Sequence, residues 1–208
     1  MQYKWINKTN NNNLIVFFNG WGMDEKIVEN LTANGFDIIE FHDYRSFEFP
    51  NIDFSEYKNK YLVAWSMGVY VCNLFYDKFT DFNGYTAING TLKPIDDNFG
   101  IPTMAYNMTV ENFNELSCAK FLKKISSTAD LKNYCSRSLE DLKQELISIR
   151  ELKIKQFLPF NKAILSTKDR IFPFKNMFAF WLDKEINITE FQGSHYIFDS
   201  FKSWGDLI

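Results

Sequence analysis

Short apolar segments alternate with helical patterns along most of this chain, and this alternation restricts its fold more than any other feature. The apolar segments have the length of buried strands and are LIVFFNG (14–20), FDIIEF (36–41), KYLVAW (60–65), GYTAING (84–90), KAILST (162–167) and INITEF (186–191). Helical spacing of apolar residues follows several of them, at 24–35, 67–79 and 174–184, and a last helix is expected from about Ile197. Strands that alternate with helices predict an α/β fold, with a mostly parallel sheet covered by helices on both faces. Functional residues are then expected where strands end, at the carboxyl edge of the sheet.

One segment interrupts the alternation. Residues 104–157 contain no convincing strand, but they include two stretches with helical spacing, NELSCAKFLKKI and LEDLKQELISIRELKIKQFL. Because this segment lies between two predicted strands, we interpret it as a helical lid inserted into the α/β domain. The length of 208 residues suits a single domain, and we expect it to span 1–208.

The insertion is basic, whereas the rest of the chain is acidic. From Lys120 to Lys155 there are nine basic and five acidic residues, a net charge of +4, while the whole chain carries −3 and the remainder therefore −7. A basic surface on an acidic protein suits an acidic partner. A solvated helical face without a partner has the same composition, and charge alone favours that simpler interpretation. The negative net charge of the chain argues against nucleic-acid binding.

The cysteines and the distribution of apolar residues indicate the cellular compartment. Cys72, Cys118 and Cys135 are widely spaced and form no pair with metal-binding spacing, so we expect reduced thiols in a cytoplasmic protein. The segment MQYKWINKTNNNN has no apolar stretch able to act as a secretion signal. Nowhere do about 18 apolar residues run together, so we expect no membrane span. We expect a monomer that needs no metal or organic cofactor.

The segment AWSMGV places a single serine between a buried strand and an amphipathic helix. A strand that turns at once into a helix crowds its own backbone, and the small residues Ala64 and Gly68 relieve that crowding. Such a turn exposes the hydroxyl of Ser66 as a nucleophile. The N–H of Met67, at the start of the helix, is free to stabilise an oxyanion. The pattern small-x-Ser-x-small also arises by chance around structural serines, and its position in the chain favours the nucleophile.

An unactivated serine is a weak nucleophile, so a base must lie within reach of Ser66. The chain has two histidines: His195 follows the last predicted strand, and His42 ends the segment FDIIEF. Either one taken alone is more often structural than catalytic. In hydrolases with this kind of strand-to-helix turn, the base follows both the nucleophile and the acid along the chain. This order selects His195, and it leaves His42 as a pocket-lining or structural residue.

The acid that orients the base is expected in a loop after an intervening strand. Asp169 lies in such a loop, within KAILSTKDRIFP, where it would hold the imidazole in the productive tautomer and stabilise its charged form. Asp96 and Asp97, which follow the strand GYTAING, remain alternatives. An ordinary loop aspartate would account for Asp169 equally well on its own.

The loop FFNGWGMD follows the first predicted strand, where a second oxyanion donor is expected. Gly20 and Gly22 let the backbone approach a reacting carbonyl closely, and the N–H of Trp21 is the natural donor. The alternative is an ordinary glycine turn. Nucleophile, acid, base and oxyanion loop in the correct order are together far less expected by accident than any one of them.

At these residues the chain resembles the α/β-hydrolases, and it is most similar to the BioG-type pimeloyl-[acyl-carrier protein] methyl ester carboxylesterases of biotin synthesis. The similar segments are FFNGWGMD (17–24), DYR (43–45), AWSMGV (64–69), AINGTLKPIDDNFGIP (87–102), KDRIFP (168–173) and GSHYIF (193–198). They are spread over nearly the whole chain. Many relatives in the wider superfamily have His-Gly where this chain has Asn19-Gly20, so the resemblance assigns no role to the Asn19 side chain.

The resemblance implies an α/β-hydrolase fold, a triad of Ser66, Asp169 and His195, and oxyanion donors at Trp21 and Met67. The chain is expected to lack the extra N-terminal strands of larger hydrolases and to be a trimmed version of that fold. The implied reaction is hydrolysis of the methyl ester of pimeloyl-[acyl-carrier protein] methyl ester to pimeloyl-[acyl-carrier protein] and methanol. No metal or organic cofactor takes part.

The implied partner is an acyl-carrier protein, and carrier proteins are acidic, which suits the basic insertion. Candidate docking residues are Lys120, Lys123, Lys124, Arg137 and Arg150. One alternative function is a serine esterase or thioesterase that acts on another acyl ester. A second is a hydrolase-shaped binding protein without turnover.

Overall fold

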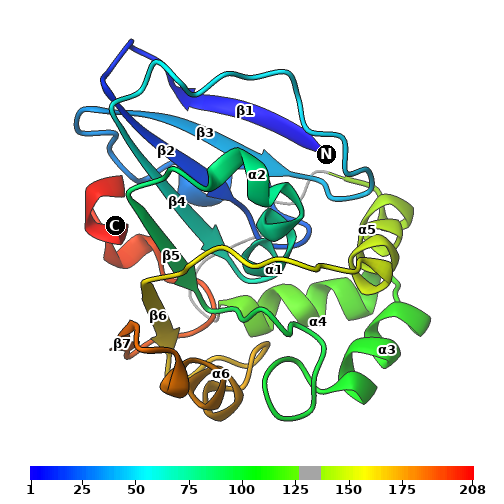
Figure 1. The fold of residues 1–208 in the computed structure, drawn as a ribbon. Helices are drawn as coiled ribbons and strands as arrows, with labels where there is room; N and C mark the ends of the chain where they lie inside the picture. Colours follow the sequence, from blue (N-terminus) through cyan, green and yellow to red (C-terminus); the bar gives the residue numbers. More distant parts are fainter. Residues whose placement is uncertain (127–136) are drawn as a thin grey trace.

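The computed structural model describes residues 1–126 and 137–208, which build a seven-stranded sheet with helices around it (Figure 1). The strands are β1 (Gln2–Asn7), β2 (Asn13–Phe18), β3 (Phe36–His42), β4 (Asn59–Trp65), β5 (Gly84–Ile88), β6 (Lys162–Ser166) and β7 (Asn187–Phe191). Their order across the sheet is β1-β3-β2-β4-β5-β6-β7. Only β1 pairs antiparallel, and every other neighbouring pair is parallel. The predicted mostly parallel α/β sheet is therefore confirmed.

Strand β1 is absent from the sequence-based prediction, which selects continuously apolar segments. Its sequence QYKWIN instead alternates polar and apolar residues from Gln2 to Trp5, and all six residues are exposed or half-buried. This alternation is typical of an antiparallel strand with one solvated face. This one N-terminal strand extends the sheet beside β3.

Alternate side chains of the central strands face two apolar cores. On one face, Val16 and Leu62 belong to a core that the sheet shares with α1 (Gly68–Val71), α2 (Tyr76–Phe79) and α6 (Phe174–Trp181). On the other face, Phe17 and Val63 pack with residues of the short 3₁₀ segments η1 (Glu25–Val28), η5 (Phe198–Ser200) and η6 (Trp204–Leu207). Both faces are covered, and regular α-helices dominate only one of them.

The helices expected at 24–35 and after Ile197 are much shorter than predicted. Asp24 does cap η1, since its side chain accepts a hydrogen bond from the N–H of Lys26. The helix nevertheless stops after one turn. Thr32 then donates its backbone N–H to Lys202 O at 3.0 Å, and Trp204 N–H donates to Thr32 O at 3.1 Å. Pairing between these two distant segments satisfies the backbone groups that a longer helix would have used.

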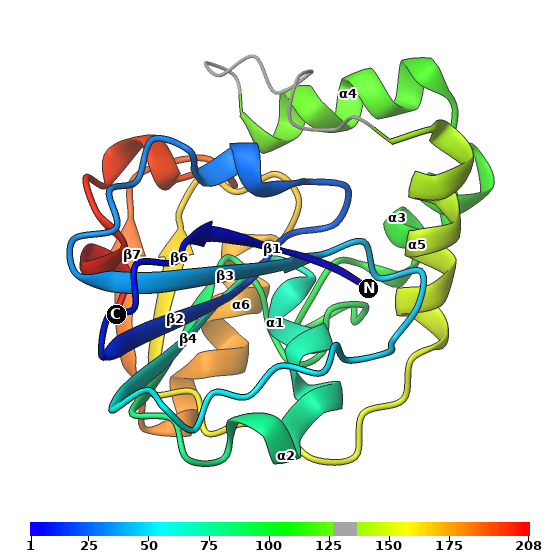
Figure 2. The same cartoon turned by 90° about the horizontal axis from the view of Figure 1, so that it is seen from above.

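The interruption between β5 and β6 is helical, as predicted. It contains α3 (Thr103–Glu111), α4 (Glu115–Ile125) and α5 (Leu139–Glu151), which we call the lid. Figures 1 and 2 both show these helices gathered on one side of the molecule, away from the C-terminus. Lys132 and Cys135, which enter the charge and cysteine arguments, lie outside the described residues. Within 1–126 and 137–208, no helix is long and apolar enough to cross a membrane.

Candidate active site

Ser66 lies directly after β4 in a left-handed backbone conformation, with φ of +58°. Its N–H donates to Ile88 O at 2.8 Å, and its carbonyl accepts from the N–H of Val69 at 3.2 Å. The turn is packed against backbone on two sides. A Cβ on Gly68 would lie 2.3 Å from Phe18 O, and a Cβ on Gly90 would lie 2.4 Å from Ser66 O. The sharp strand-to-helix turn predicted from the sequence therefore exists. It depends on glycine at position 68, two residues after Ser66, and at position 90, which lies beside Ser66 in space.

Three side chains from distant segments meet at this turn. His195 Nε2 lies 2.9 Å from Ser66 Oγ, and His195 Nδ1 lies 2.6 Å from Asp169 Oδ2. The second carboxylate oxygen of Asp169 accepts the backbone N–H groups of Ile171 and Phe172 at 2.7 and 2.9 Å. Ser66 is 5% exposed and His195 1% exposed. The geometry is that of a nucleophile, a base and an orienting acid in one hydrogen-bonded line.

The imidazole of His195 is fixed by groups that sequence reasoning did not identify. The His195 carbonyl accepts the indole N–H of Trp65 at 3.1 Å and the side-chain amide of Asn89 at 2.8 Å. Its ring lies parallel to that of Phe172, with 3° between the planes. Asn89 also accepts the N–H of Ser166 at 2.7 Å. The Asn-Gly that ends the strand segment GYTAING was the available signal, because an asparagine at a strand end can bridge to neighbouring loops.

The loop after β2 leaves one backbone donor available. Asn19 Oδ1 accepts the N–H of Gly20 at 2.8 Å, and Glu145 Oε2 accepts the N–H of Gly22 at 3.2 Å. The N–H of Met23 donates to Gly20 O at 3.3 Å. Within the described residues, the N–H of Trp21 has no protein acceptor.

The N–H of Met67 is likewise without a protein acceptor in the described part of the chain, as expected at the start of a helix. Trp21 and Met67 line one cavity together with Ser66. Two unused donors beside a serine hydroxyl form the arrangement needed to bind an oxyanion.

The alternative acids have other partners. One carboxylate oxygen of Asp96 accepts the N–H groups of Asn98 and Phe99, which closes a local turn. Asp97 accepts the N–H of Thr103 at 2.7 Å, at the first residue of α3. Neither residue is bonded to His195, so the geometry favours Asp169 over both.

The second histidine belongs to a different cluster. His42 Nδ1 lies 2.8 Å from Glu40 Oε2, and Glu40 is fully buried. Burial of His42 lowers its pKa, but its hydrogen bond to Glu40 and the Glu40 charge outweigh burial and leave the pKa raised. His42 lines a cleft that does not include Ser66. Its interpretation as a structural residue agrees with this placement.

A cavity of about 270 Å³ opens beside Ser66 and is roofed by the lid. Most of its lining is apolar and includes Ile101, Pro102, Ala105, Tyr106, Phe121, Leu146, Ile171 and Pro173. The hydroxyl of Tyr106 on α3 donates to Leu146 O on α5 at 2.8 Å, which ties two lid helices together over the cavity. An apolar cavity beside a serine suits an acyl chain.

Cationic side chains line the cavity and the groove next to it. Lys124 and Arg170 line both, and Lys123 and Lys168 line the groove alone. Among the described residues, none of these four forms an ion pair. Lys168 and Arg170 were missed in the sequence because they flank Asp169 rather than lying in the basic insertion.

Arg137 does not fit the predicted role of an exposed docking residue. Its side chain is 14% exposed and pairs with Asp43 at 2.9 Å and with Glu145 at 2.7 Å. Lys120 and Arg150 are exposed on α4 and α5, as a docking role requires. The docking prediction for Arg137 is therefore withdrawn, because its charge is already used inside the protein.

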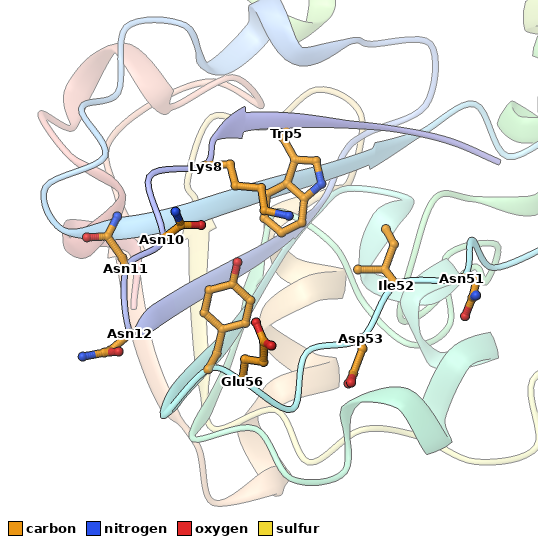
Figure 3. A pocket seen from close by; sticks show the side chains of 10 residues that line it. Trp5, Lys8, Asn10, Asn11, Asn12, Asn51, Ile52, Asp53 and Glu56 are labelled. Carbon is orange, nitrogen blue, oxygen red and sulfur yellow. The ribbon is translucent and has the colours of Figure 1, made fainter.

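A larger hollow of about 440 Å³ lies apart from these residues and is shown in Figure 3. Its lining side chains are Trp5, Lys8, the asparagines at 10–12, Asn51, Ile52, Asp53, Glu56 and Tyr57. It contains no serine, histidine or cysteine that could act as a nucleophile or base. Its lining therefore offers no counterpart to the Ser66–His195 pair.

Comparisons with known proteins extend these observations. A sequence model of the family described as "Pimeloyl-ACP methyl esterase BioG" matches residues 1–207. The chain is 38% identical over 193 residues to the malonyl-[acyl-carrier protein] O-methyltransferase of Bacteroides fragilis. That match covers 88% of this chain and 39% of the relative, so the chain spans about two fifths of the length of that protein.

Solved structures agree on the fold. The crystal structure of BioG from Haemophilus influenzae superposes with a TM-score of 0.90 at 30% identity, and the match covers 100% of this chain and 99% of that one. An esterase from Exiguobacterium antarcticum superposes with a TM-score of 0.69 at 15% identity, over 93% of this chain and 87% of that one. The architecture is thus the α/β-hydrolase fold.

Proposed function

Because the chain belongs to the BioG family of pimeloyl-ACP methyl esterases, we propose that it hydrolyses the methyl ester of pimeloyl-[acyl-carrier protein] methyl ester during biotin biosynthesis. The products are methanol and pimeloyl-[acyl-carrier protein]. The observation that carries this proposal is the hydrogen-bonded line from Ser66 through His195 to Asp169, at the base of an apolar cavity.

In the acylation step, Ser66 Oγ attacks the ester carbonyl while His195 Nε2 accepts the hydroxyl proton. Asp169 keeps the imidazole in the required tautomer and stabilises its charged form. The oxyanion accepts hydrogen bonds from the N–H groups of Trp21 and Met67. When the carbonyl re-forms, the bond to the methoxy group breaks, and His195 gives its proton to that oxygen to release methanol.

Deacylation repeats the same roles with water as the nucleophile. His195 accepts a proton from the water as its oxygen attacks the acyl carbonyl on Ser66. The ester bond to Ser66 then breaks, and the proton returns to the serine oxygen. The acyl chain leaves as a carboxylate and is still joined to the carrier through its thioester.

The partner that best suits the cationic groove is an acyl-carrier protein with its phosphopantetheine arm. Lys124 and Arg170 line both the groove and the cavity, so a phosphate held there lies on the route to Ser66. A relative named for a malonyl-[acyl-carrier protein] substrate supports this choice of partner. Lys120 and Arg150 remain docking candidates on the exposed lid, and Lys123 and Lys168 on the groove.

Mass spectrometry of the carrier-bound product tests the proposed reaction. We expect the purified protein to remove one methyl group from the carrier-bound ester and to leave the thioester intact. Release of the whole acyl chain would instead indicate a thioesterase. A preference for unrelated free esters would indicate another carboxylesterase. Absence of turnover would indicate a binding protein, and equal turnover by Ser66→Ala would show that Ser66 is not the nucleophile.

Charge reversal tests the docking surface separately. We expect Lys123→Glu/Lys168→Glu to slow hydrolysis of the carrier-bound ester and to leave a short p-nitrophenyl ester unaffected, because these lysines lie outside the cavity. The difference should shrink as salt screens the charges. Lys58→Glu/Lys78→Glu serves as the matched control, because these two exposed lysines line neither the groove nor the cavity. Equal loss on both substrates would exclude a docking role.

A further inference from the structure

The lid is bonded directly to the loop that carries Trp21. Glu145 on α5 accepts the backbone N–H of Gly22 at 3.2 Å, and the indole N–H of Trp21 donates to Leu142 O on α5 at 2.9 Å. Both contacts join segments more than 100 residues apart in the chain. One lid helix therefore fixes the backbone and the side chain of adjacent residues in this loop.

Glu145 is fully buried, and each of its two carboxylate oxygens accepts at least one hydrogen bond. Its Oε1 accepts the N–H of Tyr44 at 2.9 Å, and its Oε2 also pairs with Arg137 at 2.7 Å. Arg137 in turn pairs with Asp43 at 2.9 Å. A buried charge is costly unless it is paired and hydrogen-bonded, and this network meets that condition. The network gives the DYR motif at 43–45 a physical role, because Asp43 and Tyr44 anchor its far end.

The same loop is held from the sheet side by Asn19. The Asn19 side-chain amide donates to Glu40 at 2.8 Å and to Asp24 O at 2.9 Å, while its oxygen accepts the N–H of Gly20. Glu145 supplies the corresponding acceptor from the lid side, at Gly22. The N–H between these two fixed positions is that of Trp21, the one left available for a ligand.

We propose that Glu145 is a positioning residue for the oxyanion hole, which it serves by fixing Gly22 so that the Trp21 N–H keeps its place beside Ser66. This inference rests on the proposed function. It gives the lid a part in stabilising the transition state in addition to covering the acyl chain. Glu145 itself does not line the cavity, so it is a positioning residue and not a catalytic one.

Glu145→Gln tests this role, because it keeps the size of the side chain and removes the charge and one of the two acceptor oxygens. Loss of a single oxyanion donor typically lowers turnover by about 10²–10³-fold. A displaced donor should cost less, so we expect kcat/KM for a short p-nitrophenyl ester to fall about 10- to 100-fold. Glu140→Gln is the matched control, since Glu140 is exposed on the same helix and bonds only to Gln144 among the described residues.

A pair of inhibitors separates positioning from general damage. A trifluoromethyl ketone forms a tetrahedral adduct on the serine and needs the oxyanion hole, whereas its methyl ketone parent binds mainly as an unreacted ground state. In Glu145→Gln, the Ki of the trifluoromethyl ketone should rise by the same factor as kcat/KM falls, and the Ki of the parent should stay unchanged. Equal weakening of both inhibitors, or wild-type kcat/KM, overturns the proposal.

A second variant keeps the test decisive if Glu145→Gln fails to fold. Arg137→Met/Glu145→Met removes both charges of the buried ion pair together, which avoids leaving either one unpaired, and Asp43 keeps its pair with Arg45. It still removes the acceptor for Gly22, so the same inhibitor pattern is expected. Failure of the proposed function would give a different result: either the wild-type protein is inactive, or the Ser66→Ala variant is as active as the wild type.

Discussion

Gly68→Ala places one methyl group where the turn at Ser66 has no room. The added Cβ would lie 2.3 Å from Phe18 O and 2.6 Å from Asn19 O. Close carbon–oxygen contacts in proteins are about 3.3–3.6 Å long, so the overlap with Phe18 O is roughly 1 Å. Both oxygens belong to backbone at the end of β2, which pairs on both sides within the sheet. Relief must therefore come from the turn itself or from the loop that carries Trp21.

The size of the backbone shift that Gly68→Ala requires determines the expected losses of stability and of kcat/KM. Overpacking of this kind costs about 1–3 kcal/mol of stability, and a rigid backbone contact belongs at the upper end. A displacement of about 1 Å between reacting groups can lower a rate by about 10²-fold. We therefore expect Gly68→Ala to lose about 10²-fold in kcat/KM for a p-nitrophenyl ester while it remains folded at room temperature.

The assay compares kcat/KM and Tm with those of Gly205→Ala. A Cβ on Gly205 would meet nothing closer than 3.6 Å, so that variant should match the wild type. Wild-type activity in folded Gly68→Ala would refute the claim that the turn depends on glycine. Equal losses in both variants would refute the claim that backbone overlap is the cause.

Three further predictions address the acid, the pH dependence and the cavity. Asp169→Asn should lower kcat by about 10⁴-fold without unfolding the protein, as steady-state kinetics and circular dichroism would check. A small effect would mean that another group orients the imidazole of His195. Burial of Asp37 raises its pKa, but hydrogen bonds from Thr9, Asn11 and Tyr57 outweigh burial and leave the pKa below the usual 3.8. The ionised form is thus favoured by folding, so this stabilisation is present above pH 3.8 and is lost as the pH falls through the folded-state value. Asp37→Asn should cost about 1–3 kcal/mol in urea titrations at pH 7 and less near pH 3, and a deficit independent of pH would contradict the assignment. Ala105→Trp should fill part of the cavity and slow the carrier-bound ester more than p-nitrophenyl acetate, whereas equal slowing would place the acyl chain elsewhere.

Much of the sheet could be predicted from the sequence because buried parallel strands are continuously apolar. The segments at 36–41 and 60–65 lie within β3 and β4. Strand β1 has the weaker alternating pattern of a half-exposed edge and was overlooked. Helix lengths after 24 and 197 were wrong because pairing between Thr32 and the C-terminal segment replaced local helical bonds. Local spacing carries no information on such long-range pairing.

The arrangement of the site was predictable to the extent that chain order restricts it. Ser66, Asp169 and His195 were selected by their positions after strands, and the fold brings their side chains within hydrogen-bonding distance. The charges were less predictable, because a net charge does not distinguish exposed from buried residues. Arg137 and Glu145 counted as surface charges of a basic segment, yet they form a buried pair at the loop of Trp21.

Active-site labelling tests most directly whether Ser66 is the nucleophile. A fluorophosphonate should modify one serine per chain, and peptide mass spectrometry should place the label on Ser66. Labelling should be absent in Ser66→Ala and slowed by orders of magnitude in His195→Gln, because the imidazole accepts the hydroxyl proton. Labelling of a different residue, or a rate that does not depend on His195, would contradict the proposed mechanism.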